Sequence, residues 1–172
     1  MSIRTMIVSA GLAVSVGVAS AQPYIKPIFS SVAGAPSNTV PTLGGGWSLS
    51  TTLEVMDRPA FSPDGTRWAL GGHIDQPTTG DRVVVSGSGT SRTGSVLALR
   101  ESDATVFDGA RNWFGISERM SVRNNGDILI DGDLDGATAD DEVLVVISAD
   151  GTSQTVLHRE NDPEPTGTFG NN

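Results

Sequence analysis

The feature that most constrains the fold of this chain is an internal repeat with a spacing of about 60 residues. The run GDRVVV at 80–85 matches DDEVLV at 140–145 without a gap. Further along, GSVLALRESD at 94–103 matches QTVLHRENDP at 154–163 with a shift of one residue. Self-similarity at a fixed period is typical of repeat architectures, in which each copy is one supersecondary unit. We therefore expect the chain to contain two copies of one such unit.

Each unit is expected to hold four short β-strands. Apolar runs are short, turn residues separate them, and no long stretch shows the 3.6-residue period of a helix, so the pattern indicates an all-β protein. Asp64-Gly65 and Asn125-Gly126 are tight-turn dipeptides, in which glycine allows a positive φ. The expected strands are 58–62, 66–71, 82–87 and 95–100 in the first unit, and 118–122, 127–131, 142–148 and 154–159 in the second.

The third strand of each unit, Val83–Val85 and Val143–Ile147, does not alternate between apolar and polar residues. A strand that is apolar on both sides is covered on both faces, as in a propeller blade between two neighbouring blades. We therefore predict an all-β fold, an incomplete β-propeller-like domain of two four-stranded repeat units plus N-terminal strands. The expected core is Leu70, Val83, Val85, Val96, Leu97, Leu129, Ile130, Val143, Val145, Val156 and Leu157.

The first 21 residues have the three parts of a secretion signal: Arg4, then an apolar stretch, then the small-residue cleavage site Ala19–Ala21. The apolar stretch is too short for a transmembrane helix. We expect the mature protein to be secreted, to the extracellular space or the periplasm. The expected division is a signal peptide at 1–21, N-terminal strands and a Gly/Pro-rich loop at 22–57, repeat units at 58–107 and 108–167, and a tail at 168–172.

The composition narrows the classes of partner. The net charge is −9, and Arg4 is the only charge in the signal, so the mature chain is acidic and repels nucleic acid and anionic membrane surfaces. The chain has no cysteine, which excludes disulfides, thiolate zinc sites and cysteine catalysis. Beyond residue 21, no stretch is long and apolar enough to span a membrane. The partner that we expect is a protein or a polysaccharide.

Two stretches carry a family resemblance. FSPDGTRWAL at 61–70 resembles the start of WD40-like, TolB-like propeller repeats, and RENDPEPTG at 159–167 resembles the end of the repeats in secreted bacterial proteins named for an N-x-x-G-x-x-A-F motif. The second resemblance implies a secreted, propeller-like, non-catalytic protein, often anchored by a C-terminal sorting segment, which we do not find here. Closed propellers have at least about four blades. The two units therefore suggest a fragment of a longer protein, closure by homo-oligomerisation, or a smaller sandwich.

The acidic run DGDLDGATADDE at 131–142 matches the spacing of an EF-hand calcium loop. Asp131, Asp133 and Asp135 would be the first three ligands, the carbonyl group of Ala137 the fourth, and Glu142 the last. The flanking residues are strand-like, however, and the aligned loop of the first unit keeps only Asp75 of the carboxylates. Two interpretations stay open: a calcium clip on a β-hairpin, or a solvated acidic loop.

The sequence contains no motif that identifies a reaction. There is no G-x-S-x-G elbow, and His73 and His158 lie at different places in the repeat, in no metal-ligand spacing. We predict no catalytic residue and no cofactor other than calcium. The favoured function is a secreted, non-catalytic module for binding or structural display. The alternative is a secreted hydrolase or lyase that uses paired carboxylates.

Overall fold

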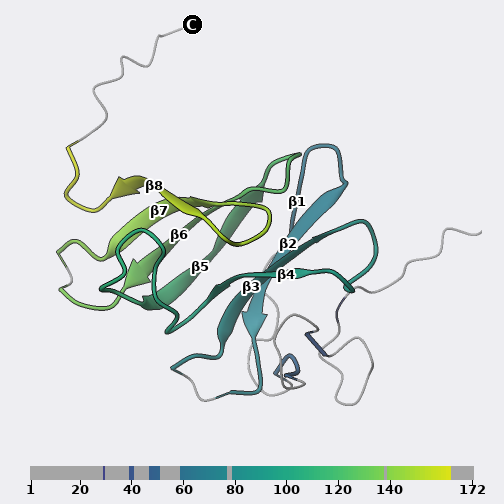
Figure 1. Cartoon of the computed structure of the whole chain (residues 1–172), viewed down its shortest axis with the longest axis horizontal. Helices are drawn as coiled ribbons and strands as arrows, with labels where there is room; N and C mark the ends of the chain where they lie inside the picture. The colour runs from purple at the N-terminus through teal and green to yellow at the C-terminus, as the bar shows by residue number, and fades with distance from the viewer. Residues whose placement is uncertain are drawn as a thin grey trace, which may run out of the picture.

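The computed structural model describes residues 29, 39–40, 47–50, 59–76, 79–137 and 139–163. Over these residues the protein is all-β without a helix, as the sequence predicts, and its eight strands form two four-stranded antiparallel sheets (Figure 1). The predicted signal peptide and tail lie outside the described residues. The first sheet holds β1 (Ala60–Phe61), β2 (Arg67–His73), β3 (Arg82–Ser88) and β4 (Val96–Arg100), and the second holds β5 (Trp113–Val122), β6 (Ile128–Leu134), β7 (Glu142–Ile147) and β8 (Gln154–Arg159).

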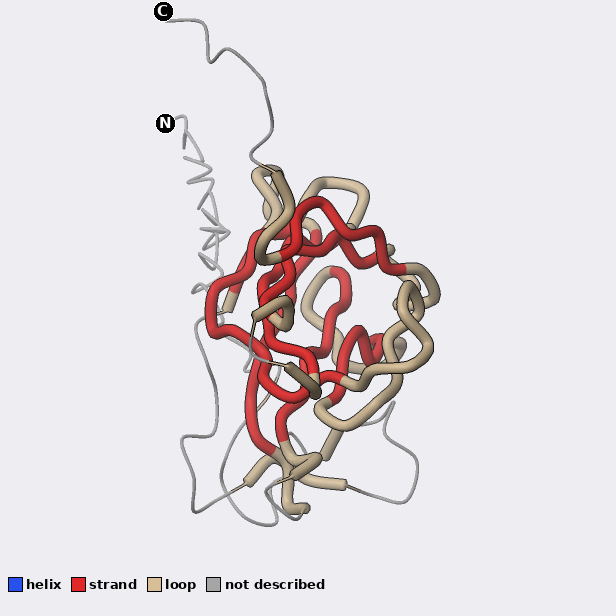
Figure 2. The backbone as a smooth tube through the Cα atoms, turned by 90° about the vertical axis from the view of Figure 1, so that its left-hand side faces the viewer, coloured by secondary structure: helices blue, strands red, loops and turns tan. Residues whose placement is uncertain are grey.

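Both sheets are simple meanders, in which each strand pairs with the next one along the chain. Figure 2 shows the same strands from the side on which the second sheet lies in Figure 1. Antiparallel neighbours can be joined by short turns, so each sheet is built from local hairpins. The predicted strand positions agree with the observed ones to within a few residues, except that β5 begins at Trp113, earlier than expected.

The two sheets have the same register. Leu70 pairs with Val85 in the first sheet, and Ile130 pairs with Val145 in the second, 60 residues later. The pairing between the third and fourth strands shifts at the same point in both sheets, which leaves one additional residue in the fourth strand. A β-bulge of this kind places two residues opposite one. The equivalence of the two sheets therefore extends to their irregularities.

Residues 47–50 hold the place in the first sheet that the start of β5 holds in the second. Thr39 and Ser48 form an isolated antiparallel bridge, and Ala104 and Asn112 form another. The structural correspondence thus begins at least as early as Thr39 in the first unit and Ala104 in the second. The unit limits predicted at 58, 107 and 167 rest on sequence matching alone and stay predictions.

One hydrophobic core lies between the two sheets. The first sheet supplies small side chains, and the second supplies larger ones. We call the contributing side of the first sheet its packed face, defined by Ala69, Val84, Ala98 and Leu99. The facing residues of the second sheet are Trp113, Ile116, Val122, Ile128, Ile130, Leu134, Val143, Val145 and Ile147.

A second core lies on the opposite side of the first sheet. It contains Trp68, Leu70, Val83 and Val85, and the ring of Phe29 packs edge-on against Trp68 with the centroids 5.7 Å apart. The first sheet is therefore buried on both faces, as the run of valines in β3 predicts. The same prediction is wrong for β7: Leu144 and Val146 are only half-buried, because among the described residues only one face of the second sheet is covered.

The predicted core is correct at six positions, which are buried: Leu70, Val83, Val85, Ile130, Val143 and Val145. Four others, Val96, Leu97, Leu129 and Val156, are half-buried. The prediction for Leu157 is wrong, because this side chain is 52% exposed. Leu157 is the additional residue of the β-bulge opposite Leu144 and Val145. The prediction assumed that both faces of the second sheet are covered, whereas no described element covers the face on which Leu157 lies.

Candidate functional site

The second sheet has one face that no other described element covers. We call it the outer face; it is defined by Leu129, Asp131, Asp133, Glu142, Leu144, Val146, Leu157 and His158. Side chains on β6 and β7 alternate, so the residues of these two strands point away from the core between the sheets, and His158 of β8 lies opposite Leu144 with Leu157 as the adjoining bulge residue. The centre of the face is apolar, and one end is acidic.

An open hollow of about 470 Å³ lies at the acidic end of the outer face. Leu144 supplies its apolar part, and four carboxylates and a histidine surround it: Asp131, Glu142, Glu160, Asp162 and His158. A smaller hollow of about 190 Å³ adjoins it at Asp131 and Leu144, and contains Arg119 and Leu129. Together the two hollows offer a surface that combines apolar contact with negative charge.

The structure brings three of the predicted calcium ligands to this face. Asp131 and Asp133 lie two residues apart on β6, and Glu142 of β7 pairs with Asp133. Gly115 of β5 leaves room for this arrangement, because a Cβ atom at that position would lie 2.9 Å from Oδ2 of Asp133. These three carboxylates therefore occupy extended strands, and the EF-hand loop that would curl around an ion is absent from residues 131–134.

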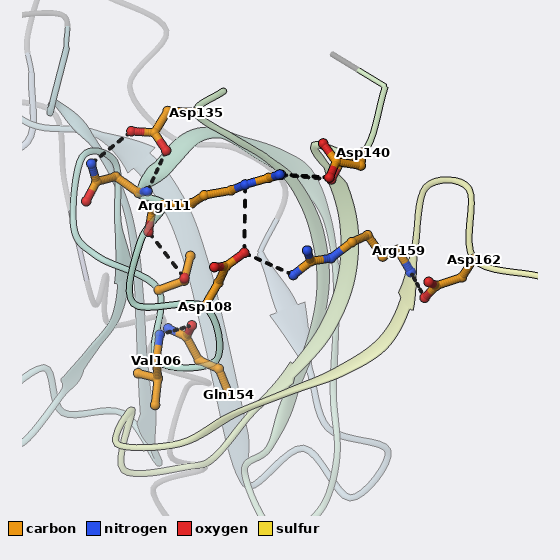
Figure 3. A network of polar contacts seen from close by, with 10 residues as sticks. Val106, Asp108, Arg111, Asp135, Asp140, Gln154, Arg159 and Asp162 are labelled. Atoms are coloured by element: carbon orange, nitrogen blue, oxygen red, sulfur yellow. Dashed lines mark hydrogen bonds and ion pairs between the residues drawn. The ribbon is translucent and has the colours of Figure 1, made fainter. Parts of the chain in front are cut away.

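Asp135 has a different role. Its Oδ1 accepts a hydrogen bond from the backbone N–H of Asn112 (2.7 Å), and its Oδ2 accepts one from the Asn112 side-chain amide (2.9 Å; Figure 3). In the first sheet, Asp75 accepts the equivalent hydrogen bond from the backbone N–H of Ser48 (3.0 Å). Asp135 thus ties the residue after β6 to the residue before β5, and Asp75 ties the end of β2 to Ser48. The carboxylate of Asp135 accepts two hydrogen bonds in this connection, and that of Asp75 accepts one from Ser48.

Arg111 holds the other end of the acidic loop. Its guanidinium donates hydrogen bonds to the carboxylate (2.7 Å) and the carbonyl oxygen (3.1 Å) of Asp140. Hydrogen bonding to this cation lowers the pKa of Asp140. Asp108 lies between Arg111 and Arg159, 3.8 Å from Nε of the first and 3.3 Å from Nη2 of the second (Figure 3).

Ala137, the remaining predicted ligand, lies exposed in the loop after β6. Among the described residues, no three histidine or acidic side chains converge closely enough to hold a metal ion. The calcium site at Asp131, Asp133, Asp135, Ala137 and Glu142 therefore stays a prediction. Sequence spacing could not reveal Arg111 and Asn112, because both precede the motif by about 20 residues and meet it only through strand pairing.

A second titratable cluster lies at the end of the first sheet. Nδ1 of His73 lies 3.2 Å from Oδ2 of the buried Asp81, although the two atoms are not aligned for a hydrogen bond. Burial raises the pKa of the nearby Glu101, and the charge of Asp81 raises it further. His73 is the last residue of β2, beyond the strand end predicted at residue 71, whereas His158 lies in the fourth strand, within the predicted range 154–159.

Within the described residues, no helix could cross a membrane. No family model matches the chain, and neither the curated proteins nor the solved structures contain a match. The family resemblance and the secretion of the mature chain therefore stay predictions, and the functional interpretation depends on the geometry of the two sheets.

Proposed function

We propose that this chain is a secreted, non-catalytic β-repeat module that binds a partner protein through the outer face of its second sheet. In this proposal the two sheets are consecutive blades of an incomplete, propeller-like stack. The observation that supports it most strongly is a difference in coverage between the packed face of the first sheet and the outer face of the second. These two faces are equivalent in the repeat, yet within the described residues another sheet packs on the packed face and none packs on the outer face.

The shared register makes the equivalence specific. Val84 of β3 corresponds to Leu144 of β7, and each is flanked by the same β-bulge. Leu99 lies opposite Val84, and His158 lies opposite Leu144. Val84 and Leu99 are buried against the second sheet, whereas His158 is half-buried and Leu144 lies at the boundary of two hollows.

The amino-acid composition of the outer face also supports a binding role. Apolar side chains at the centre with charges at the rim are typical of protein interfaces that form and dissociate. Exposed apolar patches rimmed by polar residues mark interaction sites on soluble proteins. Here Leu129 and Leu144 supply the apolar centre, the exposed Leu157 adds to it from β8, and Asp131 and Glu142 lie at its acidic border.

A site-specific photo-crosslinker tests this proposal. Placed at Leu144 and exposed to the other secreted proteins of the source cell, it should form adducts of defined mass. The control is the same group at Thr90, which is exposed in the turn after β3. Equal adducts from both positions, or none from Leu144, would contradict a docking role. Turnover of a polysaccharide or peptide that is lost in Glu142→Gln would instead favour the hydrolase.

A further inference from the structure

We infer that the partner of the outer face is a protein β-sheet with a cationic side chain at the position where this chain carries Glu118, and that it is not another copy of this chain. The inference rests on the proposed function and adds the chemistry of the partner. It is drawn from the interface between the two sheets that the described residues form.

That internal interface includes an ion pair at its edge. Arg82, the first residue of β3, places Nη2 3.7 Å from Oε1 of Glu118 on β5. Arg82 lies on the same side of β3 as Val84, so it extends from the packed face of one sheet to the neighbouring sheet. Opposite charges across an interface favour the correct partner and its register.

The charge at the equivalent position of the second sheet is reversed. In the strand register, Arg82 of β3 lies opposite His73 of β2, and Glu142 of β7 lies opposite Asp133 of β6. Where the packed face has Gly71, His73 and Arg82, the outer face therefore has Asp131, Asp133 and Glu142. Suppose that a sheet docks on the outer face as the second sheet docks on the first. Its residue at the position equivalent to Glu118 would then lie beside Glu142.

Another copy of the second sheet would bring Glu118 against this acidic end. Like charges in contact disfavour association, and such repulsion commonly excludes wrong partners. Side-chain size acts in the same direction, because Ala69, Val84 and Ala98 of the packed face are replaced by Leu129, Leu144 and Leu157. A sheet whose side chains fit against the small residues of the packed face would be overpacked against the larger residues of the outer face. The outer face therefore favours a cationic sheet and opposes self-stacking.

The internal ion pair allows a first test in the natural chain. Arg82→Glu gives the packed face the charge of the outer face and should raise the equilibrium constant for unfolding about twofold to fivefold, as expected for a partly exposed pair. Adding Glu118→Arg should restore most of the loss. Urea unfolding at low and high salt measures both. If the second substitution restores nothing, residue 118 does not select charge and the inference is wrong.

The second test adds a third unit, a copy of residues 104–163 that follows residue 163 in place of residues 164–172. Leu129→Ala, Leu144→Val and Leu157→Ala first give the outer face the side-chain sizes of the packed face. Val146→Cys supplies the only thiol in the protein, since the chain has no cysteine. Its equivalent, Ser86, is buried in the first sheet, so docking should cover it.

Three extended chains are compared with the unextended one by the rate of thiol labelling. We expect the labelling rate of the thiol at position 146 to fall at least about fivefold when the added unit carries Glu118→Arg, or when the outer face carries Glu142→Arg. We expect little protection when both positions keep glutamate, and the difference should shrink in high salt.

The outcomes separate this inference from the proposed function. Equal protection in all three extended chains would overturn the charge selection and leave the docking face intact. Protection in none of them would overturn both the docking face and the inference. Protection of the unextended chain by neutral oligosaccharides alone would assign the face to a carbohydrate and would also overturn the inference.

Discussion

At the scale of single residues, two turns of the chain share the sequence S-x-D-G-T, at 62–66 and 148–152. In each turn one aspartate oxygen accepts hydrogen bonds from the serine hydroxyl, the threonine hydroxyl and the threonine N–H, at 2.6–3.1 Å. The glycine adopts a positive φ, 70° at Gly65 and 73° at Gly151, which other residues rarely tolerate. The carboxylate closes the turn and the glycine reverses the chain.

This turn chemistry predicts a pH dependence. The hydroxyl of Ser148 and the donors of Thr152 lower the pKa of Asp150 from 3.8 to about 2. Because the folded-state pKa is depressed, the stabilisation by this carboxylate is present above about pH 4 and is lost as the pH falls through about 2. Asp150→Asn should therefore lower the Tm at pH 7, and the difference from the wild type should narrow towards pH 2. A difference independent of pH would contradict this role.

Asp135 provides a residue-level test of the calcium prediction. Removal of its two hydrogen bonds in Asp135→Ala should cost about 1.5–3 kcal/mol of unfolding free energy in EDTA, because charged acceptors form the stronger hydrogen bonds. Asp75→Ala, which loses the single exposed equivalent, should cost less. Urea unfolding measures both. If millimolar calcium stabilises the wild type but not Asp135→Ala, this carboxylate is a metal ligand as well as a structural tie.

The sequence predicts part of the candidate site. A strand-like flank with residues at i and i+2 places Asp131 and Asp133 on one face, and this is read directly from the strand period. The roles of Asp135 and Asp140 could not be predicted, because their partners come from residues 111–112. A spacing motif shows which side chains could act as ligands, but strand pairing determines which residues they contact.

At the scale of elements, glycine permits an indole ring to lie across the first sheet. Gly87 of β3 pairs directly with Trp68 of β2, and a Cβ atom at Gly87 would overlap the indole, with Cε2 at 2.9 Å. In return, Nε1 of Trp68 donates a hydrogen bond to the carbonyl oxygen of Gly89 (3.0 Å). The missing side chain thus lets the ring reach a backbone acceptor in the following turn.

Gly87→Ala should therefore destabilise the protein by about 1–3 kcal/mol, the usual cost of overfilling a packed site. Gly80→Ala is the matched control, because its added Cβ would meet no atom closer than 3.6 Å. Chemical denaturation followed by tryptophan fluorescence measures both variants. Equal stability of the two would show that the indole moves aside without cost.

Two of the observed strands are longer than their apolar runs predict, because pairing with a neighbouring strand extends them. The apolar runs predict the centres of β2 and β6, but both strands continue past them to His73 and Leu134. The additional residues include Gly72 and Gly132, which have low strand propensity. They stay extended because β3 and β7 supply their backbone partners. Propensity therefore underestimates strand length wherever a long neighbour is present.

At the scale of the whole molecule, the two equivalent faces should differ in energetic importance. Val84→Ala removes buried methyl groups between the sheets and should cost about 2 kcal/mol of unfolding free energy. Leu144→Ala removes a side chain of the open face and should cost less than about 1 kcal/mol. Urea unfolding of the monomer measures both. A larger cost at Leu144 would mean that the outer face is covered within the chain itself.

The repeat in the sequence predicts that the molecule contains two like units, but not how they are arranged. Val83–Val85 and Val143–Ile147 look alike as runs of apolar residues, yet the first is buried on both faces and the second on one. The difference depends on what lies next to each sheet, and the apolar character of the two runs does not predict it. The equivalent faces differ in charge at Arg82 and Glu142 and in side-chain size at Val84 and Leu144.

The order of strands in each sheet also sets the order of events in folding. All strands pair with their immediate neighbours in the chain, so each sheet closes through short loops, and the contact order within a sheet is low for a β protein. The interface between the sheets joins segments that are far apart in the sequence, and its loop closure costs more entropy. We expect the hairpins to form first and the sheets to dock last. Amide hydrogens of β3, central in its sheet, should gain protection before the Trp113 indole becomes shielded from solvent.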